Sequence, residues 1–399
     1  MLLDRLRQRL LDRKAAGLLR QRVTGLGPSD RVAHRDSGAV LNFASNDYLG
    51  LANHPTVLKA FHEGLDRYGA GAGASAMVSG HSLAHEQLER ALADWVAPLF
   101  PECQCLLFST GYLANLALLT AITERGDALF CDKLNHASLI DGMRLSEADH
   151  RRFPHRDMEA LERLLASSQA RIKMIVTDGV FSMDGDLAPL QALLNLAERF
   201  DATVIVDDAH AMGVLGEEGR GTMALSKICS ERFILMGTLG KAAGVSGAFV
   251  AAHPLVIEWM QQAARSFIYT TAPPPAISHA LLQSVEIIRG DEGSSRRNHL
   301  TTLIRHMQSH RAALHTIGLQ LPESITPIQP VLIGDNVAAM QCSMALACAG
   351  FWVPAIRPPT VPEGTARLRV SLSAAHTIED VSYLCSALTA PRDGRVWPD

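Results

Sequence analysis

The chain contains 399 residues, of which 47% are hydrophobic and 20% charged, and its 37 basic and 41 acidic side chains give a net charge of −4. This composition is typical of a globular protein, and the length exceeds that of a single core, so we expect a large domain with a smaller one. Because the charges nearly balance and no long run of one sign occurs, neither nucleic acid nor a membrane is expected as a partner.

The first residues and the cysteines indicate the compartment. Residues 1–22 lack an apolar signal core and carry two aspartates, so they resemble neither a secretory nor a transit peptide. Leu3, Leu6 and Leu10 recur at helical spacing, which predicts an amphipathic helix docked on the body of the protein. The seven cysteines are odd in number and form no C-x-x-C pair, which predicts reduced, buried thiols in a cytoplasmic protein.

Two histidines one helical turn apart, His81 and His85, are candidate metal ligands. No third ligand is evident, and the helical motif of zinc proteases needs a glutamate directly after the first histidine. We therefore predict no metal site.

The segment 103–123 carries no charge and is long enough to cross a bilayer. Polar residues and a glycine interrupt it, namely Gln104, Ser109, Thr110, Gly111 and Asn115. Gly111 separates the strand-like residues 105–109 from the helix-like residues 112–122. We therefore predict a buried strand, a turn and a helix.

Short apolar runs alternate with helical patterns through the middle of the chain. The runs are apolar throughout, which is typical of strands covered on both faces; they are 105–109, 128–131, 172–178, 203–208, 233–236 and 247–252. Helices are predicted over 156–168 and over 187–200, with Pro189 near the start of the second. This alternation predicts an α/β fold with a mostly parallel sheet, in which ligands bind beyond the carboxyl ends of the strands.

The pattern changes after about residue 290. Residues 289–299 are polar and are predicted to form a connector into a long helix, followed by strand-like segments, a helix over 336–349 and a last helix near 377–389. We predict an N-terminal arm over 1–40, a large α/β domain over 41–290, and a small α+β domain over 291–399.

Several polar residues follow predicted strands. Asp207 and Asp208 end one strand and His210 comes just after, although an aspartate in this position is often only a turn or helix cap. Residues 109–112 lie where a strand leads into a helix, and the free N–H groups of a helix start favour a phosphate. The D-G pair within 181–186 predicts a tight loop.

Lys241 is the only permanently charged residue between Arg232 and Glu258. Burial of an amine lowers its pKa and makes it nucleophilic, whereas a lysine that reaches the surface stays an ordinary cation. A lysine after one strand, an aspartate after an earlier strand and a helix start suited to phosphate together indicate pyridoxal 5′-phosphate. Lys241 would bind the aldehyde, Asp207 would keep the ring nitrogen protonated, and Gly111 and Tyr112 would bind the phosphate.

Five segments resemble, in order, the motifs of the α-oxoamine synthases: 41–51, 131–142, 177–190, 206–221 and 237–241. The resemblance implies a fold-type-I pyridoxal phosphate enzyme with a mostly parallel seven-stranded sheet. It also implies condensation of an amino acid with an acyl thioester and loss of carbon dioxide. Residues 355–373 are similar to the family member that joins L-alanine to a pimeloyl thioester, on CoA or an acyl carrier protein, in biotin biosynthesis.

The resemblance also assigns roles around the cofactor. It places His136 against the pyridine ring and the substrate, Ser182 and His210 at the ring hydroxyl, and Thr238 at the phosphate. Lys241, Asp207, His136 and His210 are the expected catalytic residues. Thr270 and Thr271 resemble residues that reach the neighbouring subunit's phosphate, which implies a homodimer with shared active sites.

The expected substrate residues are assigned in the same way: Arg20, Asn46, Arg357, Thr360 and Arg369. In residues 366–373, Arg367 and Arg369 fall on the same face of a strand, and alternation does not say which of the two is solvated. The resemblance selects Arg369 as the arginine that binds the amino-acid carboxylate.

The chain departs from the family where Ala242 and Ala243 follow the lysine, because the family usually has glycine directly after it. Such departures concern the packing of the cofactor loop and the preferred acyl chain. Two rival hypotheses remain, namely a sister synthase with another acyl chain or amino acid, and a catalytically silent subunit of the same fold. No G-x-S-x-G motif of a serine hydrolase occurs.

Overall fold

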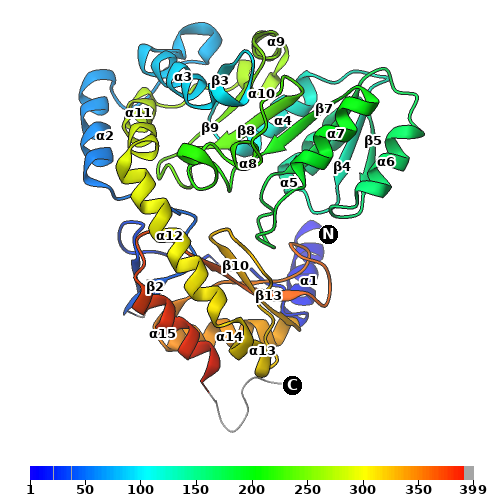
Figure 1. Cartoon of the computed structure of the whole chain (residues 1–399). Helices are drawn as coiled ribbons and strands as arrows, with labels where there is room; N and C mark the ends of the chain where they lie inside the picture. Colours follow the sequence, from blue (N-terminus) through cyan, green and yellow to red (C-terminus); the bar gives the residue numbers. More distant parts are fainter. Residues whose placement is uncertain (21, 37, 391–399) are drawn as a thin grey trace. The chain divides into compact units, whose positions relative to one another are not determined.

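The computed structural model describes residues 1–20, 22–36 and 38–390 (Figure 1). The chain divides into two compact units. The large unit contains Leu49–Ser182 and Asp186–Asn298, and the small unit contains Met1–Tyr48, Met183–Gly185 and His299–Asp399. The predicted division into parts 1–40, 41–290 and 291–399 stays a prediction about folding units.

The large unit is built around a sheet of seven strands, ordered β3-β9-β8-β7-β6-β4-β5. The strands are β3 (Gln104–Phe108), β4 (Ala128–Asp132), β5 (Asp149–Phe153), β6 (Lys173–Asp178), β7 (Ala202–Asp207), β8 (Phe233–Thr238) and β9 (Ala248–Ala252). Only β9 runs antiparallel to its neighbours, so the predicted mostly parallel sheet is confirmed. β4 and β9 are buried along their whole length and β7 at all positions but Thr203, as their continuous apolar sequences predicted.

Helices of the large unit flank this sheet (Figure 1). They are α2 (Pro55–Tyr68), α3 (Leu83–Val96), α4 (Gly111–Ala121), α5 (Ala137–Leu145), α6 (Met158–Ala166), α7 (Leu190–Phe200), α8 (Thr222–Leu225), α9 (Pro254–Ala263), α10 (Arg265–Ile268) and α11 (Pro275–Arg289). The short helical turns η1 (Ala76–Gly80), η2 (Ala97–Leu99) and η3 (Glu217–Gly219) complete it. Leu118 of α4 and Leu139 of α5 pack with Ile205, Ile234 and Val250 of the sheet in one buried cluster.

The uncharged segment 103–123 forms β3 and α4, as predicted. Thr110 is the N-cap of α4, and its hydroxyl accepts the N–H of Leu113 at 3.2 Å. Among the described residues, no helix combines the length and the apolar character needed to span a membrane.

The small unit contains two three-stranded sheets, β1-β2-β11 and β10-β13-β12. Its strands are β1 (Val32–Arg35), β2 (Gly38–Asn42), β10 (Ile328–Gly334), β11 (Phe351–Trp352), β12 (Ala355–Ile356) and β13 (Ala366–Ser371). Its helices are α1 (Leu2–Ala15), α13 (Arg311–Thr316), α14 (Asn336–Cys348) and α15 (Ile378–Thr389), and α12 (Asp291–Ser309) begins in the large unit and ends in the small one. All six residues of β13 are buried.

Three expectations from the sequence are wrong in detail, and one strand was missed. The predicted polar connector over 289–299 is mostly helical, because α12 begins at Asp291 right after Gly290 caps α11, and its acidic first turn suits the helix dipole. The edge strand β5 was not predicted, since its sequence DHRRF is polar and mostly exposed. Helix α1 forms, but it has no buried residue, so the predicted docking of its leucines is absent. All seven cysteines are free, yet Cys229 and Cys348 are exposed rather than buried.

Candidate active site

The predicted cofactor residues of the large unit gather at the carboxyl ends of parallel strands. Asp178 and Asp207 are the last residues of β6 and β7, and they lie opposite each other in the register of the two strands. Asp207 is likewise opposite Met236 of β8. Because β6, β7 and β8 are parallel, the segments that follow them leave the same edge of the sheet. The segments after β7 and β8 carry His210 and Lys241.

The amine of Lys241 contacts an imidazole. Lys241 Nζ lies 2.9 Å from His210 Nε2, and His210 is buried. The apolar residues around Lys241 in the sequence predicted a buried side chain, but Lys241 is half-buried. The side chain nevertheless lies with other polar residues at this edge of the sheet. The sequence predicted both Lys241 and His210 as residues of the site.

The alanine that replaces the usual glycine after the lysine has room here. Ala242 is buried, and a Cβ atom built on Gly213 would lie 2.8 Å from the Ala242 Cβ, too close for two side chains. Gly213 has a φ of +82°, which also favours glycine. The extra methyl group of Ala242 is therefore accommodated by the glycine opposite.

Asp207 is buried, and both carboxylate oxygens accept hydrogen bonds. Its Oδ1 accepts the backbone N–H of Ala209 at 3.0 Å, and its Oδ2 accepts Nδ2 of Asn115 at 2.7 Å. Asn115 is a residue that sequence reasoning missed, because it counted there only as a polar interruption of an apolar helix. Its position one helical turn after the predicted phosphate-binding start of α4 was the available signal.

His136 caps the start of α5 beside Asp207. Its backbone N–H donates to Asp178 Oδ1 at 3.0 Å. Partial burial of the ring lowers the pKa of His136, against the opposing effect of the Asp207 carboxylate, although the residue as a whole is exposed. Burial and the nearby Asp207 carboxylate raise the pKa of Asp178 well above its usual value. Asp178 is a second residue of this site that the sequence analysis did not single out.

The first turn of α4 has the backbone groups that can bind an anion. The first N–H groups of a helix have no carbonyl partner within it, and Gly111 and Tyr112 are the first two residues of α4. A Cβ atom built on Gly111 would lie 3.9 Å from Cβ of Thr238, so the predicted threonine is next to this helix start. The Thr238 hydroxyl donates to the carbonyl of Gly247 at 3.1 Å, which ties it to the chain beyond Lys241.

The loop that carries Ser182 is held by an ionic cluster in the large unit. The N–H of Phe181 donates to the carbonyl of Asp186 at 3.0 Å and closes the loop, as the D-G pair predicted. His155 bridges Asp132 at 3.1 Å and Asp186 at 2.8 Å, and Arg156 also contacts Asp186 at 2.9 Å. Burial alone would lower the pKa of His155, but the hydrogen bonds to the two carboxylates raise it to about 9.

This raised pKa makes a prediction about stability and pH. The folded pKa of His155 is about 9, above the ordinary histidine value of about 6.5, so its charged form stabilises the fold fully below pH 6.5 and progressively less up to pH 9. We expect His155→Gln to lower the free energy of unfolding by up to about 3 kcal/mol at pH 6 and by much less at pH 9.5. Denaturant unfolding across this pH range measures the difference, with His150→Gln on the exposed strand β5 as control. A difference that does not change with pH would contradict the account.

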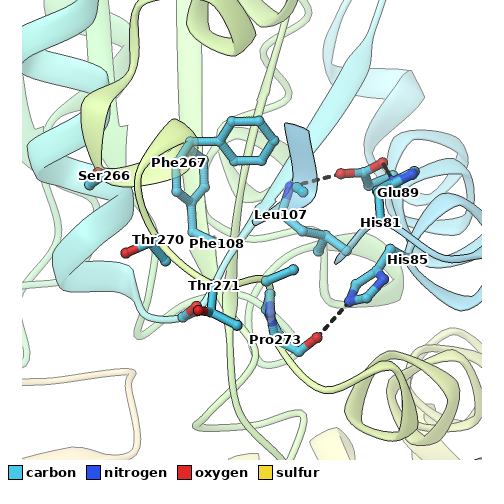
Figure 2. A pocket seen from close by; sticks show the side chains of 13 residues that line it. His81, His85, Glu89, Leu107, Phe108, Ser266, Phe267, Thr270, Thr271 and Pro273 are labelled. Carbon is cyan, nitrogen blue, oxygen red and sulfur yellow. Dashed lines mark hydrogen bonds and ion pairs between the residues drawn. The ribbon is translucent and has the colours of Figure 1, made fainter. Parts of the chain in front are cut away.

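Thr270 and Thr271 line a pocket with the two histidines that the sequence marked as possible metal ligands (Figure 2). His85 Nε2 contacts the carbonyl of Pro273 at 2.9 Å and its Nδ1 accepts the N–H of Ser82 at 3.1 Å, so both ring nitrogens are used within the protein. His81 contacts Glu89 at 3.2 Å. Within the described ranges, no cluster of histidine, cysteine and acidic side chains is arranged to hold a metal ion. The same pocket contains Ser109, two residues before Gly111.

Apart from His136, the predicted substrate residues lie in the small unit, where several hydrogen bonds fix the side chain of Arg369. Arg369 is buried on β13, and its Nη1 donates to Ser371 Oγ at 2.7 Å and to Asn46 Oδ1 at 3.0 Å. Its Nη2 lies 3.4 Å from the hydroxyl of Tyr48, which itself donates to Asn46. These hydrogen bonds hold the guanidinium in one orientation.

Arg367 has a different environment on the same strand. Its Nη1 lies 2.5 Å from Asp184 Oδ1, and its Nε donates to the carbonyl of Thr365 at 3.0 Å. Both arginines are buried, so the expectation that one of them is solvated is wrong. Arg367 thus forms an ion pair with Asp184 within the small unit, and the choice of Arg369 as the substrate residue stays a prediction from the resemblance.

The other three predicted substrate residues also lie together. Arg20 donates to Thr360 Oγ1 at 2.9 Å, and Arg357 donates to the carbonyl of Gly17. Burial, with a contribution from the Arg20 charge, lowers the pKa of Arg357. The segment after α1 is thus fixed to the loop between β12 and β13, two segments far apart in the sequence.

The groups at the sheet edge fit the chemistry of pyridoxal 5′-phosphate. An amine able to bind an aldehyde is present in Lys241, a buried carboxylate able to pair with a protonated ring nitrogen in Asp207, and a helix start with a nearby hydroxyl able to bind phosphate in α4 and Thr238. All of these groups lie in the large unit.

Comparisons with known proteins agree with this arrangement. The family model described as "Aminotransferase class I and II" matches residues 39–388. The chain is 55% identical over 397 residues to the 8-amino-7-oxononanoate synthase of Polaromonas naphthalenivorans strain CJ2, covering 97% of each chain. It is 56% identical over 394 residues to the 8-amino-7-oxononanoate synthase of Cupriavidus metallidurans, again covering 97% of each.

A solved structure of SPT with a PLP internal aldimine has a TM-score of 0.86 and 29% identity, over 96% of this chain and 95% of that one. A fold-type-I architecture, predicted from the motifs, is therefore confirmed. The chain belongs to the aminotransferase class I and II family and to the family of the 8-amino-7-oxononanoate synthases.

Proposed function

We propose that this protein is a pyridoxal 5′-phosphate-dependent acyltransferase of biotin biosynthesis. It condenses L-alanine with a pimeloyl thioester and releases 8-amino-7-oxononanoate, carbon dioxide and the free thiol. The observation that carries the proposal is the identity of 55–56% over nearly the whole chain to relatives named 8-amino-7-oxononanoate synthase. The contact between Lys241 and His210 and the buried carboxylate of Asp207 also support this reaction, because they are groups that the chemistry of the cofactor needs.

The large unit holds the cofactor. Lys241 would bind its aldehyde, the Asp207 carboxylate would pair with its ring nitrogen, and His136 would lie against the ring. Ser182 and His210 would contact the ring hydroxyl, and Thr238 with the N–H groups of Gly111 and Tyr112 would bind the phosphate. When bound, the cofactor supplies an aldehyde for the amino group of alanine and a ring that withdraws electrons from its α-carbon.

The protein's own groups then bind the substrate and move protons. Lys241 Nζ accepts the proton from the α-carbon of alanine, and it later returns a proton to the product. His210 Nε2, at 2.9 Å, orients this amine. The negative charge of Asp207 keeps the ring nitrogen protonated, which its burial strengthens by excluding water. Arg369 binds the alanine carboxylate until that group leaves as carbon dioxide.

The role of Arg369 makes a prediction that uses Arg367 as its matched control. Arg369→Lys loses the fork of parallel donors that binds a carboxylate, so we expect the KM for alanine to rise about 10- to 100-fold. Arg367→Lys changes an arginine on the same face of the same buried strand, but one whose partner is Asp184. It should lower stability and leave the KM for alanine within about threefold, since its charge serves the protein itself.

Steady-state kinetics at varied alanine concentration measure both variants. Equal changes of KM in the two, or an unchanged KM in Arg369→Lys, would argue that Arg369 does not bind the amino acid.

We further propose that the protein is a homodimer in which Thr270 and Thr271 reach the phosphate site of the partner subunit. The resemblance to the α-oxoamine synthases supports this. Thr271 is exposed, and Thr270 lies in the same pocket as Ser109 near the start of α4. Light scattering measures the oligomeric state. Mixing a Thr270→Ala, Thr271→Ala variant with a Lys241→Ala variant tests whether the active sites are shared between subunits. If they are, only hybrid dimers have one intact site, and only they would regain activity.

The experiment that tests the proposed reaction is a matrix of substrates. Purified protein loaded with pyridoxal 5′-phosphate is assayed with L-alanine, glycine and L-serine against pimeloyl-, acetyl-, succinyl- and palmitoyl-CoA, and with pimeloyl carrier protein. We expect turnover with L-alanine and a pimeloyl donor, with 8-amino-7-oxononanoate as product. Preference for another amino acid or acyl chain would identify a sister synthase, and no turnover with any pair would contradict the proposal.

A further inference from the structure

We propose that Asn115 and Ser138 are positioning residues that orient the Asp207 carboxylate and fix the tautomer of His136. This inference deepens the proposed function and rests on it for the roles of Asp207 and His136. The four side chains come from α4, α5, the end of β7 and the residue before α5, all in the large unit. They form one unbroken chain of hydrogen bonds, and neither Asn115 nor Ser138 belongs to the set that the resemblance assigned.

The Asn115 amide is held in one orientation. Its Nδ2 lies 2.7 Å from Asp207 Oδ2 and 2.8 Å from Ser138 Oγ, so the two N–H bonds of the amide each have a partner. A flipped amide would place its oxygen 2.7 Å from a carboxylate oxygen, and two acceptors at that distance repel each other. The donor assignment therefore follows from the charge of Asp207.

The oxygen of the same amide indicates that Asn115 does not serve to stabilise the fold. Asn115 Oδ1 is buried and has no hydrogen-bond partner within the described ranges 1–20, 22–36 and 38–390. A buried acceptor without a partner destabilises a fold, and such groups are rare in proteins. A leucine at this position of an otherwise apolar helix would avoid that cost. The observed asparagine thus fits a requirement for its two donors.

Ser138 links Asn115 to His136 by hydrogen bonds and thereby orients the imidazole ring. Its oxygen accepts a hydrogen bond from Asn115, so its own O–H is available to donate to His136 Nδ1 at 2.7 Å. The backbone N–H of Ser138 also points at the same nitrogen, at 3.3 Å. Two donors at Nδ1 require an unprotonated nitrogen there, which leaves the ring proton on Nε2. His136 is therefore held as the neutral Nε2–H tautomer.

Charged groups surround His136, so its protonation state affects how it can interact with the cofactor. The ring is near the Asp207 carboxylate, the Lys241 ammonium and, through its backbone, the Asp178 carboxyl. The pKa of His136 is already lowered by partial burial. A neutral ring can stack on a protonated pyridine ring, whereas a protonated histidine would repel it. Asn115 and Ser138 thereby keep Asp207 aimed and His136 uncharged.

Cofactor affinity as a function of pH tests the proposal without relying on turnover. Asn115→Leu removes both donors with little change of volume, and Ser138→Ala removes only the hydroxyl that donates to His136. The matched controls are Asn195→Leu on α7 and Ser146→Ala at the end of α5, both outside this chain of hydrogen bonds. Dissociation constants for pyridoxal 5′-phosphate are measured by equilibrium dialysis from pH 5 to pH 9, together with the thermal melting of each protein.

We expect Asn115→Leu to weaken cofactor binding about tenfold or more at pH 8, because a hydrogen bond to a charged group is lost. Its kcat for alanine should fall while the KM for alanine stays within about twofold, since Asp207 does not bind the amino acid. In Ser138→Ala the loss of affinity at low pH should begin at higher pH than in wild type, because His136 is then easier to protonate. The controls should follow the wild-type curve.

Wild-type affinity at every pH in both variants would overturn the proposal, and so would equal losses in the two controls. If Asn115→Leu does not fold, Ser138→Ala still decides, because an unshifted pH curve in that variant overturns the tautomer assignment. A wild-type protein that binds the cofactor but does not condense alanine with a pimeloyl thioester would sink the proposed reaction, while the binding curves would still decide this inference.

Discussion

Replacing Lys241 with alanine is expected to abolish the condensation, with a rate at least about 10⁴-fold below wild type, because in the proposed mechanism one amine both binds the cofactor and moves the α-proton. The purified variant should also lose the visible absorbance of covalently bound cofactor. The amine of Lys241 contacts His210 at the carboxyl edge of the sheet, where Asp207 ends β7.

Lys173→Ala is the matched control for this experiment. Lys173 is half-buried in the large unit, like Lys241, but it begins β6 and so lies at the opposite end of the strands. Its substitution should leave turnover within about twofold, in the range of ordinary surface changes. Retained turnover in Lys241→Ala, or an equal loss in Lys173→Ala, would mean that the amine at 241 has no special role.

Asp207→Asn is expected to reduce kcat about 10²- to 10³-fold while the protein still folds and binds cofactor. The amide has the same shape as the carboxylate, but its single oxygen can keep only one of the two hydrogen bonds, from Ala209 or from Asn115. The negative charge, however, is lost, and a neutral amide cannot keep the ring nitrogen protonated. Absorbance spectra and steady-state kinetics measure cofactor binding and turnover in the same preparation.

A variant of the neighbouring Asp208 is the control that distinguishes loss of the Asp207 charge from loss of a charge nearby. Asp208 is fully buried, and its carboxylate accepts the N–H and the hydroxyl of Thr222, each at 2.7 Å. Burial raises its pKa to about 7 in spite of these bonds. Asp208→Asn should therefore lower the melting temperature but change kcat by less than about fivefold. A comparable loss of kcat in both variants would point to the fold of the loop, not to the charge of Asp207.

The fold was predictable where the sequence pattern had one structural meaning. Continuous apolar runs such as 203–208 fit a strand covered on both faces, and they became β7 and its neighbours. The polar strand β5 lies at an edge, where exposure removes the apolar signal, so its sequence DHRRF gave no indication. The polar residues 289–299 are helical because Asp291 and Glu292 suit a helix start, a feature that composition alone conceals.

The site was predictable for residues that follow strands, and less so for residues that act through them. Lys241 and His210 are in contact as expected, because parallel strands bring their carboxyl ends together. Alternation could not separate Arg367 from Arg369, since the difference is the partner, Asp184 or Asn46, and a partner far away in sequence has no local signal. Asn115 was concealed for the same reason, as its meaning depends on Asp207, which is distant along the chain.

The most direct test of the central claim is to find the residue that carries the cofactor. The purified enzyme is loaded with pyridoxal 5′-phosphate, reduced with borohydride to make the linkage permanent, digested and analysed by peptide mass spectrometry. The chain has only six lysines, so every possible attachment site can be checked. The account predicts the cofactor's mass on the peptide that contains Lys241 and on no other. Attachment at a different lysine, or at none, would contradict it.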